Sequence, residues 1–327
     1  MSSRVTAAEV AHAAGVSRSA VSRTFTPGTS VAPATRLRVE AAATRLGYRP
    51  NALARTLITR RSRIVGVVMA AIDNPFHAQL LQCLDAALQR RGLAILLRGA
   101  ARPELTDELI LHLLSYQVDG VIVASGLMSS TAARACVAAE TPVVMLDRLM
   151  RASRASAVGS DNRAGGRLAA ELLLALGRRR LAFMAGTPGV STSDDRAQGF
   201  LDALAKAGLA PVAVASGGYA YEGGRVAAQA MLAARPDGVF CENDLMAMAL
   251  LDVARGSGLR VPEDLAVVGF DNIPAAALPA YALTTVAQDA PRLAETAAAL
   301  LEQRIEDPTR RATRQLIPCT LIRRETA

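Results

Sequence analysis

The first 63 residues have the spacing of helices and contain no strand-like run. In the stretch VSRSAVSRTF, Val16, Ala20, Val21 and Phe25 recur at helical intervals and form one apolar stripe. The opposite face carries only serines and arginines, with no acidic residue. The pattern therefore predicts an amphipathic helix whose outer face is positively charged.

Polar residues at fixed offsets predict where these helices begin and end. Thr6 stands three residues before Glu9, which is the spacing of a capping box at a helix start. Gly15 suits the left-handed position that ends a helix, and Ser17 can cap the next one. Two helices joined by a short turn that contains glycine form a helix-turn-helix arrangement.

A third helix is expected from Pro33 to Leu46, since proline is favoured in the first helical turn. Leu37, Val39, Ala42 and Leu46 are expected to supply its apolar positions. Ala32 occupies the cap position, where a side-chain oxygen would normally accept a backbone hydrogen bond. Because alanine has no such oxygen, the start of this helix should be less stable by about 1 kcal/mol.

From Ile64 onward, short apolar runs alternate with helical stretches, and the pattern restarts near Asp161. Such alternation is typical of parallel sheets covered by helices on both faces. It predicts two similar doubly wound lobes, whose ligands bind outside the carboxyl ends of the strands. The ten runs expected to be strands are IVGVVMA, AILLRG, GVIVAS, PVVMLD, AVGSD, LAFMAG, VAVA, GVFCEN, AVVGFD and TTVAQD.

The charge of the chain is concentrated at its amino-terminal end. Up to Arg63 there are eleven arginines and only two acidic residues, a balance of +9. Because the whole chain carries +8, the remainder carries −1. Positive charge confined to one helical segment indicates a nucleic-acid-binding module joined to a neutral one.

Several classes of protein are disfavoured by what the sequence lacks. No apolar run of about 18 residues is present, and the amino-terminal residues do not form a signal peptide, so a cytoplasmic protein is expected. The widely spaced Cys83, Cys136, Cys241 and Cys319 indicate reduced thiols, without a metal site or disulfides. GTPGVST lacks the lysine of a phosphate-binding loop, GSDNRAGG lacks G-x-G-x-x-G, and the three histidines lie in no catalytic motif. Neither an enzyme nor a cofactor is expected.

An ordered set of motifs resembles the LacI/GalR family of bacterial transcription regulators over nearly the whole chain. The motifs are VTAAEVAHAAGVSRSAVSRTF, LGYRPNALARTL, RSRIVGVV, NPF, PVVMLDR, GSDN, LGRRRLAFMAG, DDRAQGF, ENDLMAMAL, VGFDNIP and LTTVAQD. The resemblance implies an α/β protein with a three-helix helix-turn-helix head and a two-lobed periplasmic-binding-protein-like domain of doubly wound parallel sheets.

The resemblance also implies where the domains begin and end. The DNA-binding head covers residues 1–50, and a hinge helix and linker cover residues 51–63. An effector-binding and dimerisation domain follows at residues 64–327. Its first lobe comprises residues 64–160 and 288–317, and its second lobe residues 161–287 and 318–327.

The family's DNA-contacting positions can be transferred to matching residues of the head. Arg18 and Ser19 match base-reading positions, where an arginine can pair with guanine through two hydrogen bonds. Positions that match contacts to the DNA backbone are Thr6, Ser17, Ser22, Arg23, Tyr48 and Asn51. Leu57, beside Ala54 on the expected hinge helix, matches a residue that wedges between base steps in the minor groove. The serines could instead only cap helices, and the hinge could be a plain linker.

The family's small-molecule site lies between the lobes, and its matching residues follow predicted strands. Phe76 matches an apolar wall, while Asp147 and Arg196 match groups that orient the ligand. The remaining matched positions are Tyr219, Asn243, Asp271 and Gln288. Capping, turn formation or packing is the alternative for several of them. His77 follows NPF where an apolar residue is common, and it could either contact the ligand or lie exposed.

Together these residues predict a repressor whose operator affinity is controlled by a small metabolite. A sugar or sugar acid fits the polar residues best, although related pockets also hold nucleobases. The expected partners are palindromic double-stranded operator DNA, the effector and a second copy of the chain. A dimer is favoured over a tetramer because no heptad tail follows IPCTLIRRETA. The alternative is a transport-type sugar-binding protein, which would need an export signal and no basic head.

Overall fold

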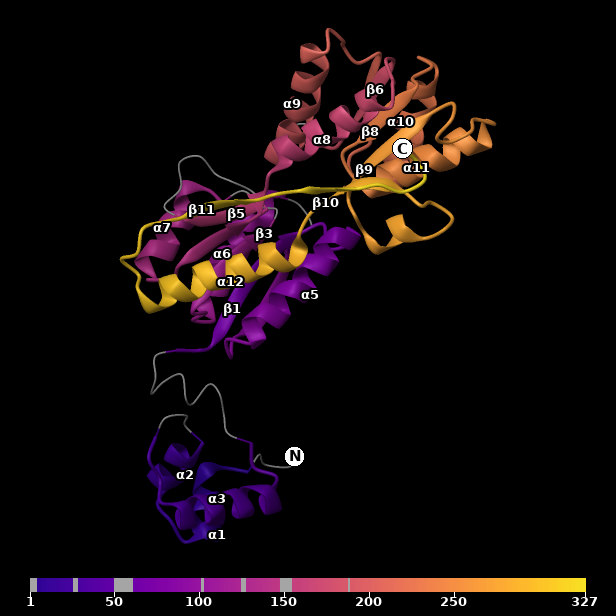
Figure 1. Ribbon diagram of the computed structural model, residues 1–327. Coiled ribbons are helices and arrows are strands. Elements are labelled where there is room, and N and C mark those ends of the chain that lie inside the picture. Colours follow the sequence, from indigo (N-terminus) through magenta and orange to yellow (C-terminus); the bar gives the residue numbers. More distant parts are fainter. Residues whose placement is uncertain are drawn as a thin grey trace. The chain divides into compact units, whose positions relative to one another are not determined.

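The computed structural model describes residues 5–25, 29–49, 61–100, 103–124, 128–147, 155–187 and 189–327, and the chain forms two units (Figure 1). Unit 1 ends at Ser62, and unit 2 begins at Arg63. Within the described ranges no helix is long and apolar enough to cross a membrane.

The described residues of unit 1 form three helices whose ends agree with the sequence analysis. They are α1 (Ala7–Ala14), α2 (Arg18–Thr24) and α3 (Pro33–Leu46). Thr6 and Glu9 form the predicted capping box, and Gly15 takes a left-handed conformation with φ 61°. Ser17 accepts a hydrogen bond from the backbone of Ala20 and so caps α2. Ala32 makes no side-chain cap for α3, as expected.

The three helices pack around a small apolar core. Val10, Val21 and Val39 are fully buried there, and Phe25 packs against Tyr48 with ring centroids 5.9 Å apart. The expectation for Leu37 is wrong, because its side chain is 67% exposed. A helix of this length presents only one stripe to so small a core, and that stripe contains Val39, Ala42 and Ala43.

Lobe 1 of unit 2 is a six-stranded parallel sheet in the order β11-β5-β4-β3-β1-β2. Helices α5 and α12 cover one face, while α6 and α7 cover the other (Figure 1). The strands are β1 (Ile64–Ala70), β2 (Ala94–Ala100), β3 (Gly120–Ala124), β4 (Val143–Leu146), β5 (Ser156–Ser160) and β11 (Arg314–Ile317). The helices are α5 (Pro75–Gln89), η1 (Pro103–Leu105), α6 (Thr106–Ser115), α7 (Ser130–Ala138) and α12 (Ala290–Glu306).

Lobe 2 repeats this plan with the order β12-β10-β9-β8-β6-β7. Helices α8 and α9 cover one face of the sheet, and α10 and α11 cover the other. The strands are β6 (Leu181–Ala185), β7 (Ala213–Ser216), β8 (Gly238–Cys241), β9 (Ala266–Asp271), β10 (Thr284–Ala287) and β12 (Thr320–Ile322). The helices are α8 (Asn162–Ala175), α9 (Ser191–Lys206), α10 (Tyr221–Leu232), α11 (Asp244–Gly256) and η2 (Pro274–Ala277).

Each of the ten predicted runs overlaps a strand, but β11 and β12 were not among them. β12 is also antiparallel to its neighbour β10. The chain leaves β11 at its carboxyl end and continues directly into lobe 2 after two residues, so β12 runs away from lobe 1 while β10 runs toward it. A strand of only three residues is too short to show a hydrophobic pattern, and its position depends on the sheet that it joins.

Two glycines allow α8 and α9 to pack closely. A Cβ atom at Gly166 would lie 2.0 Å from the backbone oxygen of Arg196, and one at Gly199 would lie 1.9 Å from that of Arg163. Only glycine permits such an approach, because no backbone atom can move aside as a flexible side chain can. The contact fixes the turn of α9 that carries Arg196.

Candidate functional site

A cavity of about 350 Å³ lies between the two lobes, at the carboxyl ends of their strands. This is the expected position for a ligand in doubly wound folds. Six of the seven residues predicted to contact the effector line it: Phe76, Asp147, Arg196, Tyr219, Asp271 and Gln288. Its volume falls within the range of about 300–1,000 Å³ typical of small-molecule sites.

The backbone around the cavity contains an unusual concentration of left-handed conformations. Asp147 has φ 70°, Tyr219 has φ 65° and Asp271 has φ 105°. Residues other than glycine adopt such angles at a cost of about 1–3 kcal/mol each, and they cluster at functional sites. The strain therefore supports the assignment of this cavity as the site.

Arg196 is held rigidly in the cavity wall by several partners. Its guanidinium lies 3.7 Å from the centroid of the Phe270 ring. Nε donates to Oδ1 of Asn162 at 2.8 Å, and Nη1 donates to the backbone oxygen of Glu242 at 2.6 Å. Nη2 lies 3.7 Å from Oδ1 of Asp271, with both side chains about 5% exposed. The arginine can therefore present its remaining N–H groups to a ligand in a fixed orientation.

Asp271 ends β9 and is bound by the residue at the next strand end. Gln288 donates from Nε2 to Oδ1 of Asp271 at 2.7 Å, and Ser160 donates from Oγ to Oε1 of Gln288 at 2.6 Å. Burial raises the pKa of Asp271 to about 6, although Arg196 and Gln288 both favour its ionised form. Additional hydrogen-bond donors from a ligand would therefore stabilise the ionised carboxylate of Asp271.

Phe76 and His77 form part of the cavity wall contributed by lobe 1. Asn74 caps α5 by accepting a hydrogen bond from the backbone of Phe76 at 3.0 Å, and Phe76 is 2% exposed. His77 also lines the cavity, and its Nδ1 lies 3.1 Å from the oxygen of Ala70 and 3.0 Å from that of Ala71. Because both partners are acceptors, Nδ1 carries the proton, and in the neutral ring Nε2 is an acceptor.

Asn243 does not line the described cavity. Its Oδ1 accepts from the backbone of Met246 at 3.0 Å and caps α11, while its Nδ2 donates to the backbone oxygen of Tyr219 at 3.0 Å. The geometry favours capping and support of Tyr219 over direct contact with a ligand.

Sequence reasoning missed several residues of this site. Asp73, Thr187 and Thr192 also line the cavity, and Glu242 lies behind the wall in contact with Tyr219. Glu242 directly follows β8, so the rule that ligands bind at carboxyl ends of strands could have identified it. Thr187 lies just after β6 and Thr192 lies in the first turn of α9, and only the fold brings these two threonines to the cavity.

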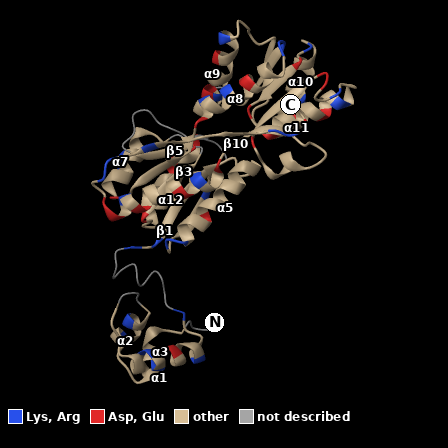
Figure 2. Ribbon diagram, in the orientation of Figure 1, with Lys and Arg blue, Asp and Glu red and all other residues tan. Residues whose placement is uncertain are grey.

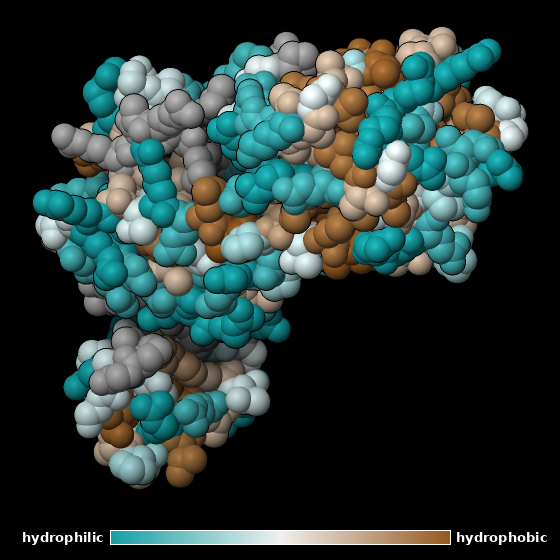
Figure 3. All heavy atoms as spheres, turned by 45° about the horizontal axis from the view of Figure 1, so that its top comes forward, coloured by the Kyte–Doolittle hydropathy of each residue, from teal (hydrophilic) through white to brown (hydrophobic). Residues whose placement is uncertain are grey.

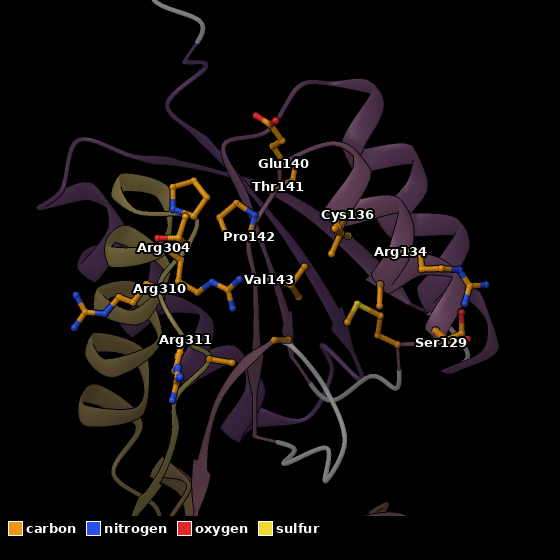
Figure 4. A pocket seen from close by; sticks show the side chains of 18 residues that line it. Ser129, Arg134, Cys136, Glu140, Thr141, Pro142, Val143, Arg304, Arg310 and Arg311 are labelled. Carbon is orange, nitrogen blue, oxygen red and sulfur yellow. The ribbon is translucent and has the colours of Figure 1, made fainter.

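A second cavity, of about 910 Å³, lies within lobe 1 beside α7 and the amino ends of β4 and β5 (Figure 4). Its floor contains apolar residues such as Cys136 and Val143, and arginines such as Arg304 and Arg311 stand at its edge. It contains none of the residues that match the family's effector site. We therefore assign the cavity between the lobes as the candidate effector site.

Unit 1 presents the predicted polar residues on its surface. Thr6, Ser17, Arg18, Ser19, Ser22 and Arg23 are all exposed, and Tyr48 is half-buried. Ser17 Oγ lies 2.9 Å from Ser19 Oγ, and Arg23 donates from Nε to the backbone oxygen of Ser19 at 3.4 Å. Figure 2 marks in blue the positions of arginines on the helices of this unit. The predicted contacts at Asn51, Ala54 and Leu57 lie outside the described residues.

Comparison with known proteins decides the family. Residues 6–51 match the model of bacterial regulatory proteins, lacI family, and residues 170–327 match that of a periplasmic binding protein-like domain. The chain is 35% identical over 333 residues to the HTH-type transcriptional regulator CelR of Thermobifida fusca, with 98% of each chain covered. The chain belongs to the lacI family of bacterial regulatory proteins.

Other members of the lacI family match nearly the whole chain. The ribose operon repressor of Bacillus subtilis (strain 168) is 33% identical, with 97% of each chain covered. A lac repressor dimer bound to operator and the anti-inducer ONPF superposes with a TM-score of 0.90 at 28% identity, covering 99% of both chains. A CelR–cellobiose complex has a TM-score of 0.76 at 33% identity and covers 99% of this chain and 100% of that one. The chain is therefore a transcription regulator with the fold predicted from its sequence.

Proposed function

We propose that this lacI-family regulator is a cytoplasmic repressor that binds a palindromic operator as a homodimer and responds to an uncharged, hydroxyl-rich ligand between its lobes. The relatives with similar full-length chains support this proposal, since they include a ribose operon repressor and a CelR–cellobiose complex. The observation that carries the choice of ligand is the composition of the cavity wall.

The described wall contains more negative than positive groups. Three carboxylates, Asp73, Asp147 and Asp271, line it, and Arg196 is the one arginine or lysine among its described lining residues. A ligand with many hydroxyl donors satisfies these acceptors, whereas a carboxylate or phosphate offers only acceptors and adds repulsion. Of the two effector classes expected from the sequence, the sugar therefore fits better than the sugar acid.

The exposed face of α2 would contact operator DNA. Arg18 and Ser19, in its first turn, would face base edges in the major groove. Ser17, Ser22, Arg23 and Thr6 would bind phosphates and set the register. Asn51, Ala54 and Leu57, in the segment between the units, would add contacts to the DNA backbone and the minor groove.

A homodimer is supported by apolar surface on lobe 2. Val212 and Val214, at the edge strand β7, and Val226, on the adjoining α10, are 37%, 60% and 62% exposed. Hydrophobic residues are also prominent over lobe 2 on the face shown in Figure 3. An exposed sheet edge with apolar neighbours is suited to covering by a second copy.

Ligand binding would change the orientation of the two lobes, which are joined by three crossings of the chain, one of them at the cavity residue Gln288. The effect would reach DNA through residues 51–63 and the dimer contact. Coupling free energies of this kind are typically about 1–3 kcal/mol and act reciprocally on both ligands.

The proposal is tested by selecting bound fragments from genomic DNA and then titrating the selected operator with the full-length protein. Cellobiose, ribose and glucuronate serve as probes, with operator affinity measured at fixed salt. We expect an uncharged sugar to change operator affinity about fivefold or more and glucuronate to have no effect. Failure to select any palindromic fragment, or a response to glucuronate alone, would contradict the proposal.

A further inference from the structure

Glu242 is a fully buried acid behind the cavity wall, at the carboxyl end of β8. Three donors converge on its Oε2 atom. The backbone N–H of Gly186 donates at 2.6 Å, Ser193 Oγ donates at 2.5 Å and the Tyr219 hydroxyl donates at 3.3 Å. These donors come from the turn after β6, the first turn of α9 and the turn after β7. One carboxylate therefore joins three segments that are separate in sequence.

Burial of the Glu242 carboxylate is energetically unfavourable. Its Oε1 atom is buried and has no hydrogen-bond partner among the described residues. Burial raises the pKa of Glu242, and the hydrogen bonds and the charge of Arg196 offset only part of that effect. Buried polar atoms are normally satisfied in proteins, and perturbed acids cluster at functional sites.

The residues that Glu242 holds form much of the lobe 2 side of the cavity. Thr187 and Thr192 line the cavity and lie between Gly186 and Ser193 in sequence. The ring of Tyr219 lies so close to Gly186 that a Cβ atom there would be 2.1 Å from its Cζ atom. Glu242 also contributes its backbone oxygen to Arg196. Release of the carboxylate would therefore affect several ligand-facing groups together.

We infer that Glu242 is a positioning residue whose ionised carboxylate fixes the Tyr219 phenol, the turn at Gly186 and the first turn of α9 at Ser193 against the cavity, so that acidification loosens this wall. The link to effector binding rests on the proposed function. The link between Glu242, Tyr219 and the turn does not, because it can be measured without any ligand.

Other ionisable groups near this cluster must be distinguished from Glu242. Arg196 is the cation that faces it, and Asp147 and Asp271 are acids that line the same cavity as Arg196 and Tyr219. The Cys241 thiol is adjacent in sequence, and burial raises its pKa, so it stays neutral. Burial likewise raises the pKa of Tyr219 to about 12, so its hydroxyl remains a donor at neutral pH. Asp271 therefore needs a control, since its pKa is about 6.

The test follows the 13Cζ resonances of the five tyrosines in the ligand-free full-length protein while the pH is varied from 5 to 8.5. Tyr219→Phe assigns the resonance of Tyr219. We expect that resonance to show an inflection from Glu242 in the wild-type protein and in Asp271→Asn. The inflection should be absent in Glu242→Gln, which keeps the size of the side chain and one acceptor oxygen.

A second measurement reports on the turn. Hydrogen exchange of the Gly186 amide at pH 7 should be roughly tenfold faster or more in Glu242→Gln, because a hydrogen bond to a charged group is lost. Glu171→Gln is the matched control, since Glu171 lies on the exposed face of α8 beside Arg167. It should leave both the exchange rate and the tyrosine inflection unchanged.

The inference is overturned if the wild-type resonance has no inflection, if Glu242→Gln keeps it, or if Asp271→Asn alone removes it. Exchange at Gly186 that is equally slow in Glu242→Gln and Glu171→Gln also overturns it. Thermal unfolding of each variant shows whether the fold is retained. Because no effector is added, failure of the proposed function would leave this result intact.

Discussion

Gln288 donates a hydrogen bond from Nε2 to Oδ1 of Asp271 at 2.7 Å, at the point where the chain leaves lobe 2 for lobe 1. The other end of the same amide accepts from Ser160 Oγ, at the end of the last strand before the chain first enters lobe 2. One side chain therefore joins two of the crossings between the lobes to an acid of the effector cavity. Its two contacts also fix which end of the amide is oxygen and which is nitrogen.

Gln288→Glu should destabilise the protein and weaken effector binding at neutral pH. The substitution replaces the donor toward Asp271 with a second carboxylate, and two like charges in a buried site repel each other. Because the repulsion requires both acids to be ionised, the loss of thermal stability should be larger at pH 8 than at pH 5. Thermal unfolding at the two pH values measures this. Gln315→Glu, at an exposed position of β11, is the control, and equal losses for the two variants would contradict the assignment.

Asp271 should reduce stability as the pH rises. Its pKa of about 6 in the folded protein lies above its ordinary value of 3.8, so the folded state binds the proton more tightly than the unfolded state. Its contribution is complete below the unfolded pKa and is lost as the pH rises through about 6. The free energy of unfolding of the wild-type protein should therefore fall by roughly 2–3 kcal/mol relative to Asp271→Asn between pH 4 and 7. Urea unfolding across this range measures the difference. If the free energy of unfolding depends on pH in the same way in both proteins, folding does not raise the pKa of Asp271.

Gly166→Ala should destabilise lobe 2 and displace Arg196. A methyl group there would lie 2.0 Å from the backbone oxygen of Arg196, and α8 and α9 would have to separate. We expect a loss of about 1–3 kcal/mol, as for other overpacked sites. Gly256→Ala, at the end of α11, is the control because no atom lies within 4 Å of the added Cβ. That variant should be neutral or slightly more stable, as alanine favours helices, and equal effects of the two in chemical denaturation would refute the packing argument.

Arg18→Ala and Arg23→Ala should affect DNA binding in different ways. Arg18 lies in the first turn of α2, so the Arg18→Ala variant should lose about 1–3 kcal/mol of its preference for the correct base and keep its affinity for random DNA. The Arg23→Ala variant should bind all DNA sequences more weakly, and its binding should depend less on salt concentration. Binding isotherms on the selected operator and on random DNA at several salt concentrations separate the two effects. Identical losses of affinity for both variants on both DNAs would contradict the assignment of Arg18 to bases and Arg23 to phosphates.

Ala32→Ser should stabilise unit 1. The structure confirms that α3 begins without a side-chain cap, although Pro33 follows in the first turn. A serine oxygen there could accept a hydrogen bond from the first turn and raise the free energy of unfolding by about 0.5–2 kcal/mol. Ala34→Ser, one residue inside the same exposed helix start, controls for composition. A larger gain from Ala34→Ser in thermal unfolding would argue against a missing cap.

Much of the candidate site could be predicted because it depends on strand ends and family motifs. Asp147, Asp271 and Gln288 follow apolar runs, and such residues meet at one edge of a parallel sheet. Asn243 also follows a strand, but its side chain is used to cap α11 and to support Tyr219. Proximity to a strand end does not determine whether a side chain faces the ligand or the next helix.

The sequence by itself determined the local elements, the family and the division of charge. Caps, glycines and hydrophobic periodicity act over a few residues, so the three helices of unit 1 and ten of the strands could be recognised without the fold. Only the tertiary structure decided the antiparallel pairing of β12, the contact through Gly166, and the convergence of Gly186, Ser193 and Tyr219 on Glu242. These features join residues far apart in the chain, and the buried environment that raises the pKa values of Asp271 and Glu242 exists only once both lobes have folded.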